Sequence, residues 1–230
     1  MTALPPVFGF AALTVLAFEA ARHLAKRVGH PVLNPTLVSI LALIGLLSLG
    51  RVPYASYMQG GAVIAWLLGP ATVALGIPLA RHAGAIRRDS LPILLALLAG
   101  AVTAAVAGPL VLALCGGASA LQLAMAPKAA TTPIAMAVAR EIGGAASLAA
   151  VFAIAGGVVV AIAARPLLGW LRIEDHRAFG LAAGVAGSGI GAAEAVARDP
   201  QAGAYAALGV GLTAIATALL VPMLAGLHLM

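Results

Sequence analysis

The residues best suited to chemistry lie in two short polar segments of an otherwise apolar chain. The first segment reads Pro127-Lys128-Ala129-Ala130-Thr131-Thr132-Pro133. A lysine within an apolar membrane segment is costly and marks a candidate functional site. With the hydroxyls of Thr131 and Thr132, its ammonium could bind a small carboxylate. A helix that begins after Pro133 would add backbone N–H groups and a positive dipole end. The alternative is that Lys128 extends to the outer membrane surface.

The second segment, residues 184–191, is rich in glycine. Glycine lets a backbone approach a ligand closely. We therefore predict that the N–H and C=O groups of this segment contribute to substrate binding. The residues concerned are Gly187, Ser188, Gly189 and Gly191. The alternative is tight helix packing, because these small residues recur at four-residue spacing.

Two further polar residues are candidates at the ends of apolar runs. Asn34 precedes Pro35 and is typical of a helix N-cap, with a role in lining the substrate site as the alternative. Glu194 could couple proton or cation movement, or it could pair with Arg198 four residues later. His, Cys and carboxylate residues have no metal-ligand spacing, and no Ser and His residues suggest a nucleophile with its base. The sequence therefore predicts no metal, no cofactor and no enzymatic activity.

The composition indicates the elements that must position these residues. Of 230 residues, 63% are hydrophobic, and only 13 are Lys or Arg and 7 Asp or Glu. Such a chain could not cover its apolar surface in water. Its uncharged runs are long enough for spanning helices, which need about 20 residues. The basic residues form no continuous stripe for nucleic acid, and we assign them to cytoplasmic loops. The sequence therefore predicts an all-α, polytopic protein of the cell inner (cytoplasmic) membrane.

Two segments, 121–140 and 180–197, are interrupted by proline or glycine, which disrupt helical hydrogen bonding or loosen the backbone. They are predicted to be broken or re-entrant. If both segments are re-entrant hairpins, ten basic residues lie on the inner side of the membrane and two, Arg51 and Arg140, on the outer side. If both segments cross the membrane instead, eight basic residues lie on the inner side and four on the outer side. The positive-inside rule therefore favours hairpins. Continuous spanning helices are predicted near 5–21, 31–50, 61–80, 91–112, 147–170 and 203–226.

Prolines and Ala-Arg pairs recur every 56 to 59 residues, which indicates internal repeats, a common design in secondary transporters. The prolines are Pro53, Pro109, Pro166 and Pro222. With both interrupted segments as hairpins, the two halves of 121–226 have opposite orientations, as in inverted repeats. We expect a single membrane domain over 1–230. In it, residues 1–112 form four mainly scaffolding helices. Residues 113–230 form a hairpin–helix–hairpin–helix part that binds substrate.

The first polar segment resembles the Pro-Lys-(Ser)-(Val)-Thr-Thr-Pro-Ile-Ala signature of the LrgB/CidB family. Leu33-Asn34-Pro35 and the run from Leu68 to Leu75 also match, and the similarity extends from about residue 20 to 224. That family is similar to the C-terminal half of the plastid glycolate/glycerate translocator, and some bacterial members are linked to pyruvate uptake. Its older label is antiholin-like regulation of murein hydrolase export and autolysis. One departure is Ser188, where the family usually has histidine, so a role for that histidine does not carry over.

The resemblance and the residues together predict a secondary transporter of small monocarboxylates such as glycolate, glycerate or pyruvate, working as an elevator. The expected partners are a small organic acid, the lipid bilayer, a coupling proton or sodium ion, and a second copy in a dimer. The alternative is an antiholin-like regulator that acts through an LrgA/CidA-like membrane partner. No nucleic acid is expected.

Overall fold

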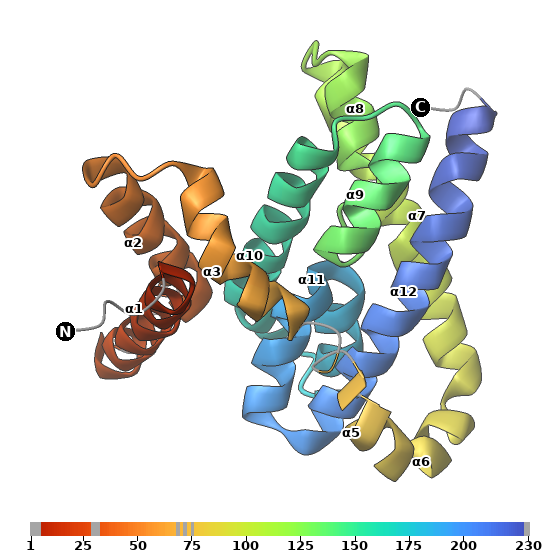
Figure 1. The fold of residues 1–230 in the computed structure, drawn as a ribbon. Helices are drawn as coiled ribbons and strands as arrows, with labels where there is room; N and C mark the ends of the chain where they lie inside the picture. Colours follow the sequence, from red (N-terminus) through yellow and green to blue (C-terminus); the bar gives the residue numbers. More distant parts are fainter. Residues whose placement is uncertain (1–5, 29–32, 68–69, 71–72, 75, 228–230) are drawn as a thin grey trace. The chain divides into compact units, whose positions relative to one another are not determined.

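The computed structural model describes residues 6–28, 33–67, 70, 73–74 and 76–227, and these residues form helices and no strand (Figure 1). The chain divides by its contacts into two compact units, residues 1–75 and 76–230. Helix α7 (Ser90–Leu114) lies in the second unit, where it packs against later helices. The expected division of one membrane domain after residue 112, into a scaffold part and a substrate-binding part, stays a prediction.

Among the described residues of the first unit, α1 packs against α2 and α3. Their bounds are α1 Pro6–Val28, α2 Pro35–Leu49 and α3 Tyr54–Trp66. Thr14 in α1 contacts Tyr57 in α3 by a hydroxyl–hydroxyl hydrogen bond of 2.9 Å, and the Phe10 ring meets Tyr57 edge-on. With 15 and 13 residues, α2 and α3 are shorter than the roughly 20 residues that a perpendicular span needs.

The predicted continuous helix over 61–80 is wrong. Helix α3 ends at Trp66, and α5 covers Gly76–Arg81. Pro70 and Pro78 fall within the predicted helix and lack the N–H that helical hydrogen bonding uses. Residues 68–69, 71–72 and 75 of that prediction lie outside the described residues.

The second unit is built around three long helices, α7, α10 and α12. They contain 25, 25 and 27 residues and are about 38 to 40 Å long, enough to cross a bilayer. The predicted spans near 91–112, 147–170 and 203–226 are thus confirmed. The bounds of the remaining elements are α6 Ala83–Arg88, α8 Ser119–Met125, α9 Thr132–Glu141, α10 Ala146–Trp170, α11 His176–Arg198 and α12 Pro200–Gly226.

Helix α11 folds back on itself and forms a re-entrant hairpin. A straight helix of this length would separate His176 from Arg198 by about 33 Å. Instead, the Arg198 guanidinium lies 5.4 Å from the centre of the Phe179 ring. The His176 Nδ1 atom lies 3.8 Å from a carboxylate oxygen of Asp199. The reversal occurs at Ser188, the residue with non-helical backbone angles inside α11. Although α11 is long and apolar enough to span a membrane, its two limbs enter and leave at the same end of the unit.

Helices α8 and α9 form a second re-entrant hairpin. The six residues 126–131 join them, and Gly144, just beyond α9, returns to the backbone of α8. A Cβ atom at Gly144 would lie 2.9 Å from the Ala124 backbone nitrogen. In Figure 1 this hairpin enters from the upper end of the unit, and α11 enters from the lower end. The two interrupted segments predicted at 121–140 and 180–197 are therefore confirmed as hairpins, whereas the duplication inferred from repeats stays a prediction.

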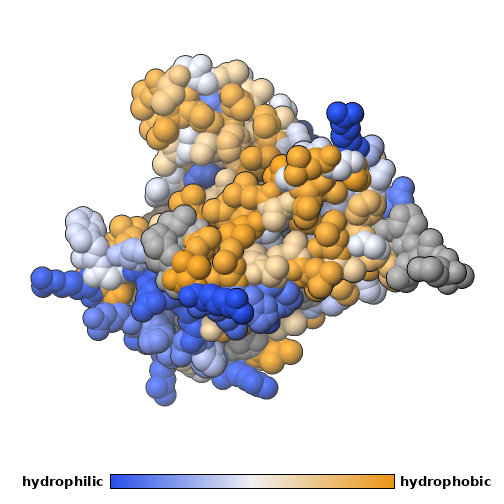
Figure 2. All heavy atoms as spheres, turned by 90° about the vertical axis from the view of Figure 1, so that its left-hand side faces the viewer, coloured by the Kyte–Doolittle hydropathy of each residue, from blue (hydrophilic) through white to orange (hydrophobic). Residues whose placement is uncertain are grey.

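The surface is consistent with a multi-pass membrane protein. Large hydrophobic side chains are exposed along α7, α10 and α12, and Figure 2 shows broad apolar areas with hydrophilic side chains gathered in the lower part of the view. Water would make this exposure unfavourable, whereas lipid would not. Helices α1, α7, α10, α11 and α12 have the length and hydropathy of membrane spans.

Candidate functional site

The tip of the first hairpin carries Lys128. Its neighbours Pro127, Ala129 and Ala130 are buried, whereas Lys128 itself is half-buried. A Cβ atom added at Gly108 of α7 would lie 2.9 Å from Lys128 Cε. Glycine at position 108 therefore makes room for the aliphatic part of the lysine. This contact fixes the level of Lys128 near residue 108 of α7.

The Lys128 ammonium forms no ion pair with any residue that the structure describes. The other charged side chains described in the second unit lie near its two ends. An unpaired cation at membrane depth is costly and favours an anionic partner. Next to it, α9 begins at Thr132, and the half-buried Thr131 side chain makes no cap hydrogen bond. Thr132 is half-buried and Pro133 exposed. The first tip thus combines a charge, two hydroxyls and a helix N-terminus.

The tip of the second hairpin is strained at Ser188. Its φ of 51° and ψ of −140° lie in a region that non-glycine residues rarely adopt, at a cost of about 1–3 kcal/mol. The side chain is 6% exposed, and its hydroxyl has no hydrogen-bond partner in the described structure. The next residue, Gly189, is exposed, and a Cβ added there would meet open space. Strain, an unused hydroxyl and open space therefore coincide at this tip.

Most other glycines of the second hairpin serve close packing. A Cβ at Gly184 would lie 2.2 Å from the Ala206 carbonyl oxygen of α12, and one at Gly191 would lie 2.1 Å from the Ala183 carbonyl oxygen of the opposite limb. Gly187 packs against Val160 of α10. The packing interpretation of these glycines therefore describes Gly187 and Gly191, and Gly189 is the glycine that lies open.

Both hairpins pack against α7, α10 and α12, each in a different half. On α10, the first hairpin contacts Ala149 and Ala153, and the second contacts Gly157 and Val160. On α7, Val185 of the second hairpin lies against Gly100, eight residues before the Lys128 contact at Gly108. The two tips therefore end at adjacent levels of the same helices, near the middle of the unit.

Two threonines of α12, Thr213 and Thr217, lie between the levels that the two hairpins occupy. Toward the start of α12, Val210 packs with the second hairpin, and toward its end Val221 packs with the first. Thr213 is fully buried and Thr217 is 4% exposed. The Thr213 hydroxyl has no partner among the described residues. Neither threonine was predicted from the sequence as a site residue, although their four-residue spacing places two hydroxyls on one face of an apolar helix.

Asn34 and Glu194 already have partners. Asn34 belongs to the first unit, is buried, and caps α2 by accepting from the backbone N–H groups of Thr36 and Leu37 at 2.9 and 3.3 Å. The carboxylate of Glu194 accepts from Arg198 at 2.6 and 2.8 Å. The capping and ion-pair interpretations thus describe these side chains in the structure.

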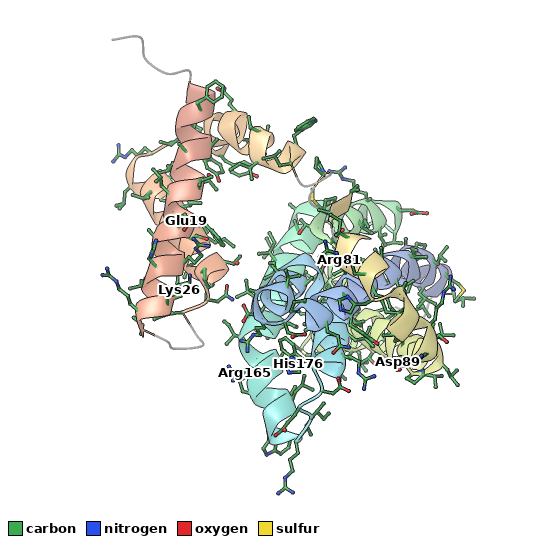
Figure 3. The ribbon with its side chains drawn as sticks, turned by 90° about the horizontal axis from the view of Figure 1, so that it is seen from below. Glu19, Lys26, Arg81, Asp89, Arg165 and His176 are labelled. Carbon is green, nitrogen blue, oxygen red and sulfur yellow. The ribbon has the colours of Figure 1, made fainter. Side chains whose placement is uncertain are left out.

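A charged network lies at the base of the second hairpin, where Arg177 contacts both Asp175 and Asp89. Asp89 also accepts from the hydroxyl of the buried Tyr205. Hydrogen bonding from Arg177 holds the pKa of the Asp175 carboxyl below its usual range. An apolar groove of about 570 Å³ extends from this network along α7 and the first limb of α11 to Gly100 and Ala186. Figure 3 views this charged end from below. The network links the hairpin base to α7 and α12.

The two tips have the chemistry of a site for a small anion. They present one cation, several hydroxyls and two helix N-termini, and they lie where the hairpins end inside the unit. The described residues contain no group of three or more His, Cys, Asp or Glu that could hold a metal ion.

Comparison with known proteins identifies relatives along nearly the whole chain. The model of the LrgB-like family matches residues 14–227. A holin-like protein CidB of Staphylococcus aureus is 30% identical over 212 residues, which cover 92% of this chain and 93% of that protein. An uncharacterized protein of Haemophilus influenzae is 30% identical over 94% of both chains. Protein YxaC of Bacillus subtilis, also uncharacterized, is 34% identical over 88% of both chains. No solved structure matches the chain.

The family match covers most of α1, both hairpins and the three long helices of the second unit. Together with the apolar helices, it describes a multi-pass membrane protein whose relatives include proteins named holin-like. The chain belongs to the LrgB-like family.

Proposed function

We propose that the protein is a secondary transporter of small monocarboxylates in the cytoplasmic membrane. The observation that carries the proposal is the pair of re-entrant hairpins, which enter from opposite ends and stop at adjacent levels of α7, α10 and α12. Interrupted helices that end near the membrane midplane are typical of substrate sites in secondary transporters. The substrate-binding groups are Lys128, Thr131 and Thr132 on one tip and the region of Ser188 and Gly189 on the other.

The charge at the tips favours a monovalent anion. The ammonium of Lys128 has no acidic partner among the described residues, so a single carboxylate would neutralise it. The N-terminus of α9 adds a positive dipole end beside it. A dicarboxylate would bring an uncompensated negative charge to membrane depth, which is costly. A coupling proton or sodium ion, movement of the hairpins as an elevator, and assembly as a dimer are parts of the same proposal.

Uptake into liposomes tests the proposal. Purified wild-type protein is expected to take up radiolabelled glycolate, lactate or pyruvate. Lys128→Met keeps an unbranched side chain against Gly108 but removes the charge, so uptake is expected to fall at least about tenfold. Lys26→Met is the matched control, because Lys26 is exposed on α1, and its uptake should equal that of the wild type. Folded wild-type protein that moves none of these acids would refute transport.

A second candidate function is antiholin-like regulation of murein hydrolase export and autolysis. The names of the relatives favour it, since several are called holin-like protein CidB, and those names favour it more than they favour transport. In this function the protein would act through an LrgA/CidA-like membrane partner. Substitutions at the tips would then leave cell lysis unchanged, whereas polar substitutions on the exposed face of α7, such as Leu95→Ser, would reduce co-purification with the partner. Lysis that follows carboxylate uptake in every variant would count against this function.

A further inference from the structure

We propose that the hydroxyls of Ser188 and Thr213 form a second polar pole of the substrate site. This pole would bind the oxygen on the carbon next to the carboxylate, while Lys128 holds the carboxylate itself. The inference rests on the proposed transport function and assigns a role to Thr213, a residue of α12 outside both hairpins.

Both hydroxyls are buried without a partner among the described residues. Ser188 is 6% exposed and Thr213 is 0% exposed. Neither oxygen has a hydrogen-bond partner among the described residues. Every other buried side-chain oxygen or nitrogen of those residues has one. Buried polar groups in proteins are nearly always hydrogen-bonded, because leaving one unsatisfied is costly. Two such groups in one part of the molecule indicate a ligand with hydrogen-bonding atoms.

The first limb of α11 packs against α12 in a regular register. Gly180 packs on Ala202, and Gly184 packs on Ala206, so the two helices run in parallel with an offset of 22 residues. Gly209 also lies against the backbone at Val185. One further turn along both helices brings Ser188 level with residues 210–213 of α12. The two unpartnered hydroxyls therefore lie within about one helical turn of each other along α12.

The backbone around Ser188 offers further hydrogen-bond donors. Ser188 reverses the chain, and the second limb begins directly after it, so its first N–H groups have no partner within that limb. A Cβ at Gly189 would meet open space, and Gly189 is exposed. Hydroxyl and amide donors thus lie beside a space that a small molecule could enter. Donors of this kind suit a hydroxyl or carbonyl oxygen.

Lys128 and Ser188 are separated along α7 by a distance that suits a small acid. Val185 lies at the level of Gly100, and Ser188 lies three residues nearer to the first hairpin. Lys128 lies at the level of Gly108. The levels of Ser188 and Lys128 thus differ by about five residues, or roughly 7 Å of helix rise. Hydrogen bonds of about 3 Å at each end leave room for an acid of two or three carbons.

A site that hydrogen-bonds a substrate oxygen discriminates strongly against an analogue that lacks it, because its own polar groups are then left unpaired. The wild-type protein should therefore prefer glycolate to acetate and lactate to propionate. Removal of one hydroxyl should reduce this preference by about 10- to 100-fold, mainly by weakening binding of the hydroxy acid.

The experiment measures competition by glycolate and by acetate for binding of radiolabelled glycolate to the full-length protein in detergent. Thr213→Val keeps the shape of the side chain and removes its hydroxyl, whereas Thr213→Ser retains the hydroxyl. Ser188→Ala removes the other hydroxyl of the proposed pole. Thr103→Val is the matched control, because Thr103 is exposed on α7. Support requires that Thr213→Val and Ser188→Ala lose the preference for glycolate, whereas Thr213→Ser and Thr103→Val retain it.

Two outcomes would contradict the inference in different ways. Glycolate could bind while Thr213→Val and Ser188→Ala leave the ratio of the glycolate and acetate affinities unchanged. In that case the second polar pole is wrong, and the proposed transport function is not contradicted. If the folded wild-type protein binds no carboxylate, the proposed function fails and the second pole fails with it. Thermal unfolding of each variant separates loss of binding from loss of folding.

Discussion

At the scale of single residues, unfavourable features gather at the two hairpin tips. Among the residues that the structure describes, the buried hydroxyl of Ser188 has no partner and its φ is positive, and the half-buried ammonium of Lys128 forms no ion pair. At the base of the second hairpin, by contrast, Asp89, Arg177 and Tyr205 satisfy one another. Proteins retain strain and unpaired polar groups mainly where function requires them. The distribution of these features therefore supports a site at the tips.

The strain at Ser188 leads to a stability prediction. Glycine adopts a φ of 51° without the penalty that a Cβ atom causes. Ser188→Gly should therefore be more stable than Ser188→Ala by about 1 kcal/mol, since both variants remove the hydroxyl and differ only in the Cβ atom. Thermal unfolding in detergent, followed by circular dichroism, would measure the difference. Equal midpoints for the two variants would show that the backbone at position 188 is not strained.

At the scale of elements, small residues allow the second hairpin to pack closely. Gly180 and Gly184 place the first limb against carbonyl groups of α12, and Gly191 places the second limb against the first. Without a hydrophobic driving force inside lipid, membrane helices associate through such close contacts. The glycine-rich sequence of α11 therefore stabilises the hairpin by packing, and it leaves Gly189 open at the tip.

Gly184→Ala tests this packing. The new Cβ would lie 2.2 Å from the Ala206 carbonyl oxygen, so the hairpin would have to move away from α12. Overpacking of this kind costs about 1–3 kcal/mol, which should lower the thermal midpoint by roughly 2–12 °C in a chain of this size. Gly156→Ala on α10 is the matched control, because its Cβ would meet nothing within 4 Å and alanine favours helix. A Gly184→Ala midpoint equal to that of the control would exclude the close approach.

Much of the order of helices and hairpins could be predicted from the sequence. The contacts that individual residues make could not. Proline and glycine interrupt residues 121–140 and 180–197, which predicted broken or re-entrant segments, and the count of basic residues on each side favoured hairpins. The role of each glycine depends on the element packed against it, so Gly187 and Gly189 looked alike in sequence. Thr213 has no local signal beyond its spacing to Thr217. Its burial beside the second hairpin depends on the register between α11 and α12.

At the scale of the whole molecule, charge indicates the orientation in the membrane. One end of the second unit carries seven arginines, and the opposite end carries Arg140. The seven are Arg81, Arg87, Arg88, Arg165, Arg172, Arg177 and Arg198. Basic residues accumulate in cytoplasmic loops. The base of the second hairpin is therefore expected inside the cell, and the base of the first hairpin outside.

Cys115 provides a direct test of this orientation. It is the one cysteine of the chain, is exposed, and follows α7 at the end that carries Arg140. A membrane-impermeant maleimide added to intact cells should therefore label the wild-type protein. In a Cys115→Ser background, Ala145→Cys should also be labelled, whereas Glu174→Cys should react only after permeabilisation, because α10 separates the two loops. Cys115→Ser alone is the control for background reaction. If positions 145 and 174 react from the same side, α10 does not cross the membrane, and two hairpins entering from opposite faces would be impossible.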